Sequence, residues 1–128
     1  MKLLLDSHVL LWSIDSPDLL SNRARAVIVD EKNELYVSVV SMWEIAIKAG
    51  AGKLRIPGAP NFLETHLEKL GVRNYLPVTL SHVRQVSKLP AVHKDPFDRM
   101  LLAQAITERL SLVSKDAHFH KYPVEVIW

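Results

Sequence analysis

The chain has 128 residues and a formal net charge of +2, and 48% of its residues are hydrophobic, which predicts one compact domain over residues 1–128 with a single core. The near balance of charges gives no electrostatic reason to choose a polyanionic partner. Cysteine is absent, which excludes disulfides and thiolate metal sites; with apolar runs of only a few residues, we expect a cytoplasmic protein without a membrane span.

Short apolar strands are predicted to alternate with helices along the chain. Consecutive apolar or β-branched residues indicate buried strands, and apolar residues every three or four positions indicate helices. This pattern predicts an α/β fold, with a mainly parallel central sheet of about five strands between helices, an α/β/α sandwich. The expected strands are 3–5, 35–40, 74–78, 110–114 and 124–128; the expected helices start near Ser7, Ser21, Met42, Asn61, Ser81 and Pro96; and a connector is expected at Pro57 and Pro60.

Acidic residues follow two of the predicted strands directly. Asp6 ends the first strand, and Asp116 comes shortly after the strand at 110–114. Ligands of open α/β sheets bind at the carboxyl ends of the strands, so carboxylates there suggest a site. An aspartate that only caps the next helix is an equally good interpretation of Asp6.

The sequence His93-Lys94-Asp95-Pro96-Phe97-Asp98-Arg99 is expected to begin a helix that continues through an apolar run. Pro96 suits the first helical position and Asp95 suits the N-cap. On purely structural grounds, Asp95 caps this helix and Asp98 offsets its dipole.

A further acid, Glu44, is expected in the first turns of the helix after the second strand. Ser41 and Glu44 have the S-x-x-E spacing of a capping box. Glu44 would otherwise pair with Lys48 one turn later or point across the strand ends. The residues expected on the buried face of this helix are Met42, Ile45, Ala46 and Ala49.

All strands of a parallel sheet end at one edge, which is where four acids would meet. Clustered carboxylates resist ionising together unless a cation balances them. Mg²⁺ and Mn²⁺ prefer such ligands and support phosphodiester hydrolysis, so a hydrolytic nuclease site is predicted, with Ser7 and Ser114 as supporting hydroxyls; helix capping is the other interpretation of Ser7. The four acids are Asp6, Glu44, Asp98 and Asp116.

Together these motifs resemble a PIN domain and, more narrowly, the VapC-type toxins of bacterial type II toxin–antitoxin pairs. The motifs that carry the resemblance are Asp6 after an apolar strand, Ser-x-x-Glu at 41–44, His-x-Asp-Pro-Phe-Asp-Arg at 93–99 and Ser-x-Asp at 114–116. The resemblance implies a single PIN-like domain with Mg²⁺- or Mn²⁺-dependent endoribonuclease activity on RNA. It also implies a homodimer and inhibition by a cognate VapB-like antitoxin. The residues to which it assigns metal binding and catalysis are Asp6, Glu44, Asp98 and Asp116.

Residues beside these acids are expected to support the site. Ser7 and Ser114 stand where the family often has Thr, and both keep a hydroxyl. Asp95 caps its helix or helps to orient the site. Arg99 is expected to pair with a carboxylate or with the RNA backbone. His93 is expected to orient its loop by hydrogen bonds or to touch a phosphate.

Other function classes fit the sequence less well. The main alternative is a non-catalytic RNA- or protein-binding α/β module whose acids only cap helices. A receiver domain would need a phosphoacceptor after 76–79, and a haloacid-dehalogenase-like phosphatase would need a second Asp two residues after Asp6. The spacing of His118 and His120 permits a zinc site, but a surface loop is the better interpretation. Two of the three tryptophans, Trp12 and Trp43, suit the core or a protein interface better than base stacking.

Overall fold

The structure, a computed structural model, describes residues 1–56 and 61–128, so the connector predicted at Pro57 and Pro60 lies outside the described residues. Within the described residues the strands are β1 (Lys2–Leu5), β2 (Glu34–Ser38), β3 (Val72–Leu76), β4 (Ser111–Val113) and β5 (Val126–Ile127). They form one sheet in the order β3-β2-β1-β4-β5, and every neighbouring pair is parallel. The predicted parallel sheet is confirmed.

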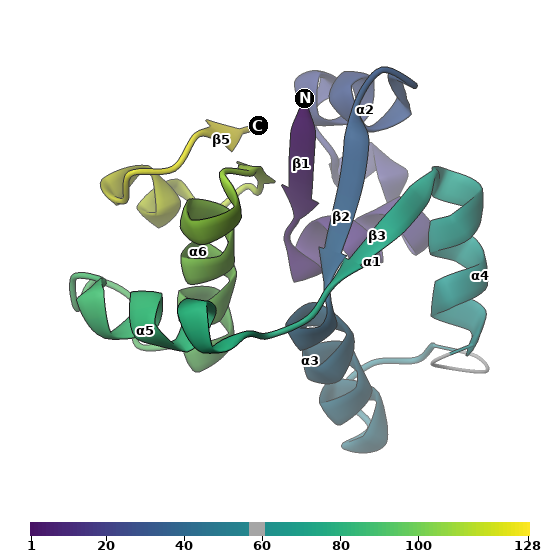
Figure 1. Ribbon diagram of the computed structural model, residues 1–128. Helices are drawn as coiled ribbons and strands as arrows, with labels where there is room; N and C mark the ends of the chain where they lie inside the picture. The colour runs from purple at the N-terminus through teal and green to yellow at the C-terminus, as the bar shows by residue number, and fades with distance from the viewer. Residues whose placement is uncertain (57–60) are drawn as a thin grey trace.

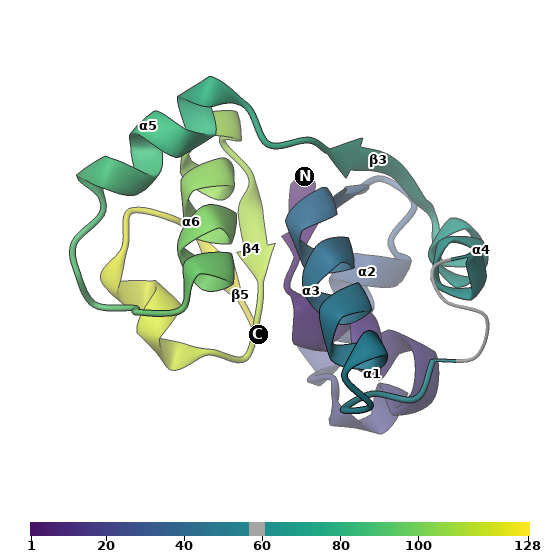
Figure 2. The ribbon, with the colours of Figure 1, turned by 90° about the horizontal axis from the view of Figure 1, so that it is seen from below.

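Helices cover both faces of this sheet. In the part of the chain that the structure describes, the α-helices are α1 (Ser7–Asp15), α2 (Asn22–Val29), α3 (Val39–Gly50), α4 (Asn61–Leu70), α5 (Leu80–Lys88) and α6 (Pro96–Glu108), and the 3-10 helices are η1 (Pro17–Leu19) and η2 (Ala117–Lys121). Helices α1, α2 and α4 pack on one side, and α5 and α6 pack on the other (Figure 1, Figure 2). This arrangement is the expected α/β/α sandwich. Among residues 1–56 and 61–128, no helix has both the length and the apolar character needed to cross a membrane.

The central strand β1 supplies both hydrophobic cores. Leu3 and Leu5 belong to the cluster that contacts α1, α2 and α4, whereas Leu4 belongs to the cluster built around α6 and β4. Successive side chains of a strand point to opposite faces, so a strand covered on both faces is apolar throughout. All three leucines are 0% exposed, and each contributes about 1.5–3 kcal/mol by burial.

The order of the strands creates a crevice between the ends of β1 and β4. From β1 the chain continues to β2 on one side, and β4 later joins the other side, so these two ends form the topological switch point. The backbone N–H of Asp6 donates to the Val113 carbonyl at 3.1 Å, which joins the two ends. Helix α3 continues from β2 beyond the same edge of the sheet (Figure 1).

The start of α3 differs from the prediction. The strand before it ends at Ser38, whose hydroxyl caps the helix by accepting from the Val40 N–H at 3.1 Å. The predicted capping box of Ser41 and Glu44 is therefore wrong, and both residues lie inside the helix and are buried. Val39 and Val40 are compatible with this early start. β-Branched side chains disfavour a helix mainly because they crowd the preceding turn, and the first turn of a helix has no turn before it.

Two further details of the helices differ from prediction. In α3, Ile45 is buried and Met42 packs against the core as expected, but Ala46 is exposed and Ala49 only partly buried, because the buried stripe of the helix runs through Ser41, Glu44 and Ile45. In α5, Thr79 rather than Ser81 is the N-cap, and the His82 side chain completes a capping box with it.

Candidate active site

The acids predicted to converge lie at the carboxyl edge of the sheet. Three of them line one cavity of about 330 Å³, and Glu44, on α3, lies close enough for its charge to act on both Asp6 and Asp98. Both Asp6 and Glu44 are buried, with exposed fractions of 5% and 7%. The residues that line the cavity are Asp6, His8, Trp12, Asp98, Lys115 and Asp116.

The Asp6 side chain does not cap α1, although Asp6 occupies the N-cap position of that helix. Its Oδ2 accepts a hydrogen bond of 2.7 Å from Ser114 Oγ across the switch point. Burial raises the pKa of the Asp6 carboxyl, and the hydrogen bond from Ser114 opposes part of that rise. The helix-capping interpretation of Asp6 is wrong, and Ser114 orients this carboxylate.

The Glu44 carboxylate is held from two sides. Ser7 Oγ donates to Glu44 Oε1 at 2.8 Å, and Lys48 Nζ contacts Oε2 at 3.0 Å as the predicted ion pair one turn along the helix. The Ser7 hydroxyl therefore serves Glu44 and does not cap α1. Each of the two predicted serines contacts one acid, and neither acid is free to rotate away from the sheet edge.

The two acids at the start of α6 have different environments. Asp95 caps the helix as predicted, accepting from the N–H groups of Phe97 at 2.8 Å and Asp98 at 3.4 Å. The Asp98 carboxylate has no hydrogen-bond donor or ion-pair partner among the described residues. Burial raises the pKa of Asp98 to about 7, and the negative charges of Asp95 and Asp6 add to the rise. The positive charge of nearby His93 offsets only part of this rise.

Asp116 shows the opposite behaviour, although it lines the same cavity. Its Oδ2 lies 3.2 Å from His93 Nε2, and its Oδ1 accepts from the His118 N–H at 2.9 Å and lies 3.1 Å from His118 Nδ1. Burial alone would raise the pKa of Asp116, but the hydrogen bonds from His118 and His93 outweigh it and lower the pKa. Asp116 is therefore ionised while Asp98 resists ionisation.

One donor group at this site mixes imidazole with carboxylate. His93, Asp98 and Asp116 each offer a ligand atom, and the three atoms lie within 4.8 Å of one another. Carboxylates suit Mg²⁺ and Mn²⁺, and imidazole suits first-row transition ions. The set therefore fits a small divalent cation. Sequence reasoning gave His93 only a role in orienting its loop or touching phosphate.

His93 does orient its loop, as expected. Its backbone N–H donates to the Tyr122 hydroxyl at 3.0 Å, and its Nδ1 lies 3.1 Å from the same oxygen. Sequence analysis missed Tyr122, which is buried and follows η2, because nothing in the local sequence distinguishes it from a core tyrosine.

The carboxylate pairing predicted for Arg99 does not form. Among the described residues its guanidinium contacts no carboxylate and instead donates to four backbone carbonyls, one in the last turn of α5 and three in the segment between α5 and α6. Such loops leave carbonyls without regular partners, and one guanidinium with five donors satisfies several of them. The acceptors are Val86, Leu89, Pro90 and His93, at 3.1, 3.5, 3.0 and 3.2 Å. Arg99 fixes the loop that presents His93.

The remaining candidates lie in different places. His118 contacts Asp116, and no zinc site with His120 appears among residues 1–56 and 61–128. Trp43 is 61% exposed and packs edge-on against Phe97, so it is not a core residue. Trp12 is half-buried, packing on the core with one part and lining the acidic cavity with another.

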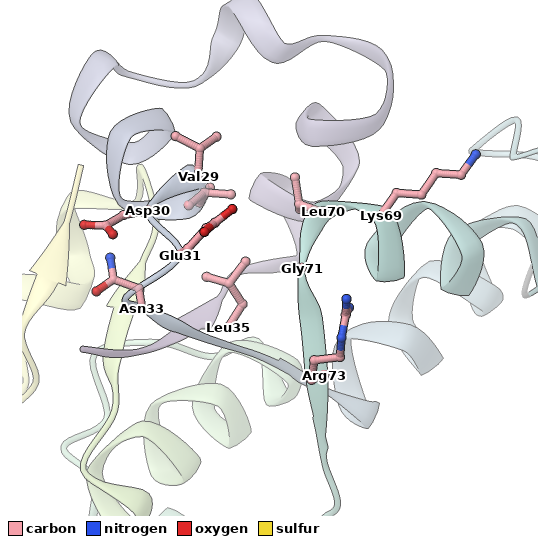
Figure 3. Close-up of a pocket in the computed structure, with 10 residues that line it drawn as sticks. Val29, Asp30, Glu31, Asn33, Leu35, Lys69, Leu70, Gly71 and Arg73 are labelled. Atoms are coloured by element: carbon pink, nitrogen blue, oxygen red, sulfur yellow. The ribbon is translucent and has the colours of Figure 1, made fainter.

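A second cavity, of about 570 Å³, lies beside the amino ends of β2 and β3 (Figure 3). These strand ends are opposite to the carboxyl ends that carry the acids. It is formed by the turn between α2 and β2 together with the start of β3. Glu31 and Leu35 point toward its centre, whereas Lys69 points away (Figure 3). Its charged side chains carry both signs, and it contains none of the four clustered acids. The acidic cavity at the carboxyl edge remains the candidate active site.

Comparison with known proteins places this geometry in a family. The sequence model of the PIN domain family matches residues 3–125 of this chain. Ribonuclease VapC22 of Mycobacterium tuberculosis is 31% identical to this chain, over 96% of each protein.

Several solved structures share the fold at low sequence identity. VapBC2 from Rickettsia felis, bound to a DNA fragment from its promoter, gives a TM-score of 0.71 at 14% identity, covering 98% of this chain and 97% of that one. DNA-bound VapBC from Salmonella typhimurium gives 0.72 at 14% identity, covering 98% and 96%. FitAcB from Neisseria gonorrhoeae gives 0.62 at 19% identity, covering 97% and 95%. At these identities the likeness concerns the fold.

Proposed function

Because the chain belongs to the PIN domain family, we propose that it is a divalent-metal-dependent endoribonuclease and the toxin of a type II toxin–antitoxin pair. The observation that carries the proposal is the Asp98 carboxylate, which shares a cavity with Asp6 and Asp116 and has no donor among the described residues. Holding carboxylates together in this way is unfavourable unless a cation neutralises them. VapC22 of Mycobacterium tuberculosis, which is 31% identical to this chain, is a ribonuclease by name.

We assign metal binding to the four acids, with His93 at the border of the site. The carboxylates suit Mg²⁺ or Mn²⁺, whereas both ring nitrogens of His93 already contact protein oxygens, Nδ1 the Tyr122 hydroxyl and Nε2 Asp116, so His93 orients a ligand beside the metal. When bound, such an ion acts as a Lewis acid toward the phosphate and lowers the pKa of water. The acids assigned to the metal are Asp6, Glu44, Asp98 and Asp116.

The chain's other residues hold these ligands in place. Ser114 donates to one oxygen of Asp6, and Ser7 donates to one oxygen of Glu44. These hydrogen bonds limit the rotation of both carboxylates. His93 holds Asp116, and Arg99 holds the loop of His93. A preorganised cluster of this kind keeps its geometry when RNA arrives, so the binding energy of the substrate is not spent on ordering the site.

The main alternative is a non-catalytic binding module in which the acids only cap helices. Asp95 caps α6 and Asp116 caps η2, which agrees with that alternative. Asp6 and Glu44 make no capping hydrogen bond, however, and both are buried beside serine hydroxyls instead. Structural capping therefore leaves the two most buried acids unexplained.

The proposed toxin has two protein partners, a cognate VapB-like antitoxin and a second copy of itself. The solved structures of similar fold are toxin–antitoxin complexes, and α3 exposes Trp43 and Ile47 by 61% and 46%. Large exposed side chains such as tryptophan are enriched at protein interfaces. An arginine of the antitoxin would pair with the acids and exclude the metal. We propose a cytoplasmic location as well, since cellular RNA, the proposed substrate, is found there.

Mapping cleavage of total cellular RNA tests the function. Wild type should cut RNA in Mn²⁺ and stop in EDTA, and Asp98→Asn should lose this cleavage. Asp95→Asn is the matched control, because asparagine also caps a helix and the same helix turn loses one charge. Equal cleavage by wild type and Asp98→Asn, or cleavage that EDTA does not affect, would refute a metal-dependent nuclease at this site.

A further inference from the structure

The cavity that contains the acids has a second wall of aromatic and basic side chains. His8 and Trp12 lie one turn apart on α1, with ring centroids 5.8 Å apart. Lys115 stands between Ser114 and Asp116 in the sequence and lines the same cavity. None of these three residues has a part in the metal site proposed above.

The Trp12 ring is fixed on one side and accessible on another. Its centroid lies 5.9 Å from the Trp128 ring, and both tryptophans pack against the core that β1 shares with α1 and α2. The Lys115 ammonium lies 5.8 Å from the Trp12 centroid in a cation–π contact. Lys115 is exposed and no ion pair holds it among the described residues. Trp12 is thus a rigid platform, covered by one movable cation.

We infer that this wall is a nucleotide subsite, in which one base of single-stranded RNA stacks on the Trp12 ring and the Lys115 ammonium pairs with the adjoining phosphate. The subsite presupposes the ribonuclease function proposed above. A π-face and a nearby cation are the two elements with which proteins hold single-stranded RNA. The cavity, at about 330 Å³, has the size of a small-molecule site and suits one nucleotide unit.

The lining of the cavity favours RNA over a protein helix. An apolar helix would dock into an apolar groove, but here three carboxylates and a lysine line the same cavity as the tryptophan. Stacking also tolerates any base, because every base has a π-face. We therefore expect Trp12 to contribute affinity at one position of the substrate and little sequence preference. This role differs from the core or protein interface expected from the sequence.

Binding of a labelled single-stranded RNA, followed by fluorescence anisotropy in the cleavage-deficient Asp98→Asn protein with Mn²⁺, tests the subsite. Trp12→Leu keeps an apolar side chain but removes the π-face, so Kd should rise about 5- to 150-fold. Trp12→Phe should restore most of the affinity. Tyr75→Leu is the matched control, since it removes an exposed aromatic ring from β3, away from the cavity, and should leave Kd unchanged.

Salt dependence tests the Lys115 half of the inference. Lys115→Gln should reduce the slope of log Kd against log salt by about 0.7, the value for one lost contact to a single-stranded phosphate. Lys121→Gln, an exposed lysine at the end of η2, is the matched control and should keep the slope. Trp12→Leu should change Kd without changing the slope, because stacking releases no counterion.

An RNA series with a single abasic position completes the test. One abasic position should weaken binding to the protein with Trp12 and have no effect on the Trp12→Leu variant. If Trp12→Leu is folded by circular dichroism and binds RNA as tightly as its parent, the base site is wrong. Unchanged RNA affinity together with lost binding of the antitoxin would assign Trp12 to a protein partner and also overturn it. Absence of metal-dependent cleavage in wild type would refute the nuclease separately, since the affinities are measured without cleavage.

Discussion

Replacing Asp98 by Asn should stabilise the metal-free protein at pH 8. The pKa of Asp98 is raised from 3.8 to about 7, mainly by burial. At 1.36 kcal/mol for each pH unit, ionising this group above pH 7 costs at most about 4 kcal/mol. Because Asp98 is partly open to solvent, screening reduces the cost to roughly 1–2 kcal/mol. An acid in the first turn of a helix stabilises it by about 0.3–1 kcal/mol, and the variant loses this contribution. The net gain in stability of Asp98→Asn is therefore about 1 kcal/mol.

The pH dependence has a definite sign. The folded state binds the Asp98 proton more tightly than the unfolded state, so its contribution to stability is fully present below pH 3.8 and is lost as the pH rises to about 7. The advantage of Asp98→Asn should therefore be large at pH 8 and small at pH 4. Thermal melts in EDTA measure it, and 1 kcal/mol corresponds to a rise of about 4 °C in Tm for a chain of this size.

Mn²⁺ should reverse the order of the two proteins. At a hundredfold excess over Kd, a ligand of the folded state adds about 2.7 kcal/mol to the free energy of unfolding of wild type, and it should add much less to Asp98→Asn. Glu31→Gln, which removes an exposed acid far from the site, should melt as wild type does under both conditions. If Asp98→Asn melts below wild type in EDTA at pH 8 and both gain equally from Mn²⁺, Asp98 serves only the helix dipole.

Three further predictions concern the site, its loop and the assembly. Asp6→Asn, Glu44→Gln and Asp116→Asn should each lower metal-dependent RNA cleavage while circular dichroism shows an intact fold; full cleavage by any two at limiting metal would contradict the four-acid site. Arg99→Lys should lose most of the hydrogen bonds to the four carbonyls, so urea unfolding should show a free energy of unfolding lower by about 1–3 kcal/mol. A change below about 0.5 kcal/mol would show that these hydrogen bonds are dispensable. Light scattering should give the mass of two chains, and a strict monomer at high concentration would remove the homodimer proposal.

Local sequence determined the elements whose signals act within a few residues. The leucines of β1 are apolar without interruption, and only a central strand covered on both faces buries such a run. Asp95 and Pro96 begin α6 as predicted, because an N-cap and the helical position after it are adjacent in the chain. Even the meeting of Asp6 with Asp116 followed from the sequence, since parallel strands joined by helices must end at one edge of the sheet.

Contacts between distant residues were decided by the tertiary structure. The acceptors of Arg99, the pairing of His93 with Asp116 and the position of Trp12 in the cavity depend on how loops and helices pack, and short-range patterns carry no information about that packing. The choice of the residue that caps α3 also depended on the tertiary structure, although the two candidates, Ser38 and Ser41, are only three residues apart. Both serines are equally able to cap a helix, and the length of β2, set by its pairing with β1 and β3, determined which serine does so.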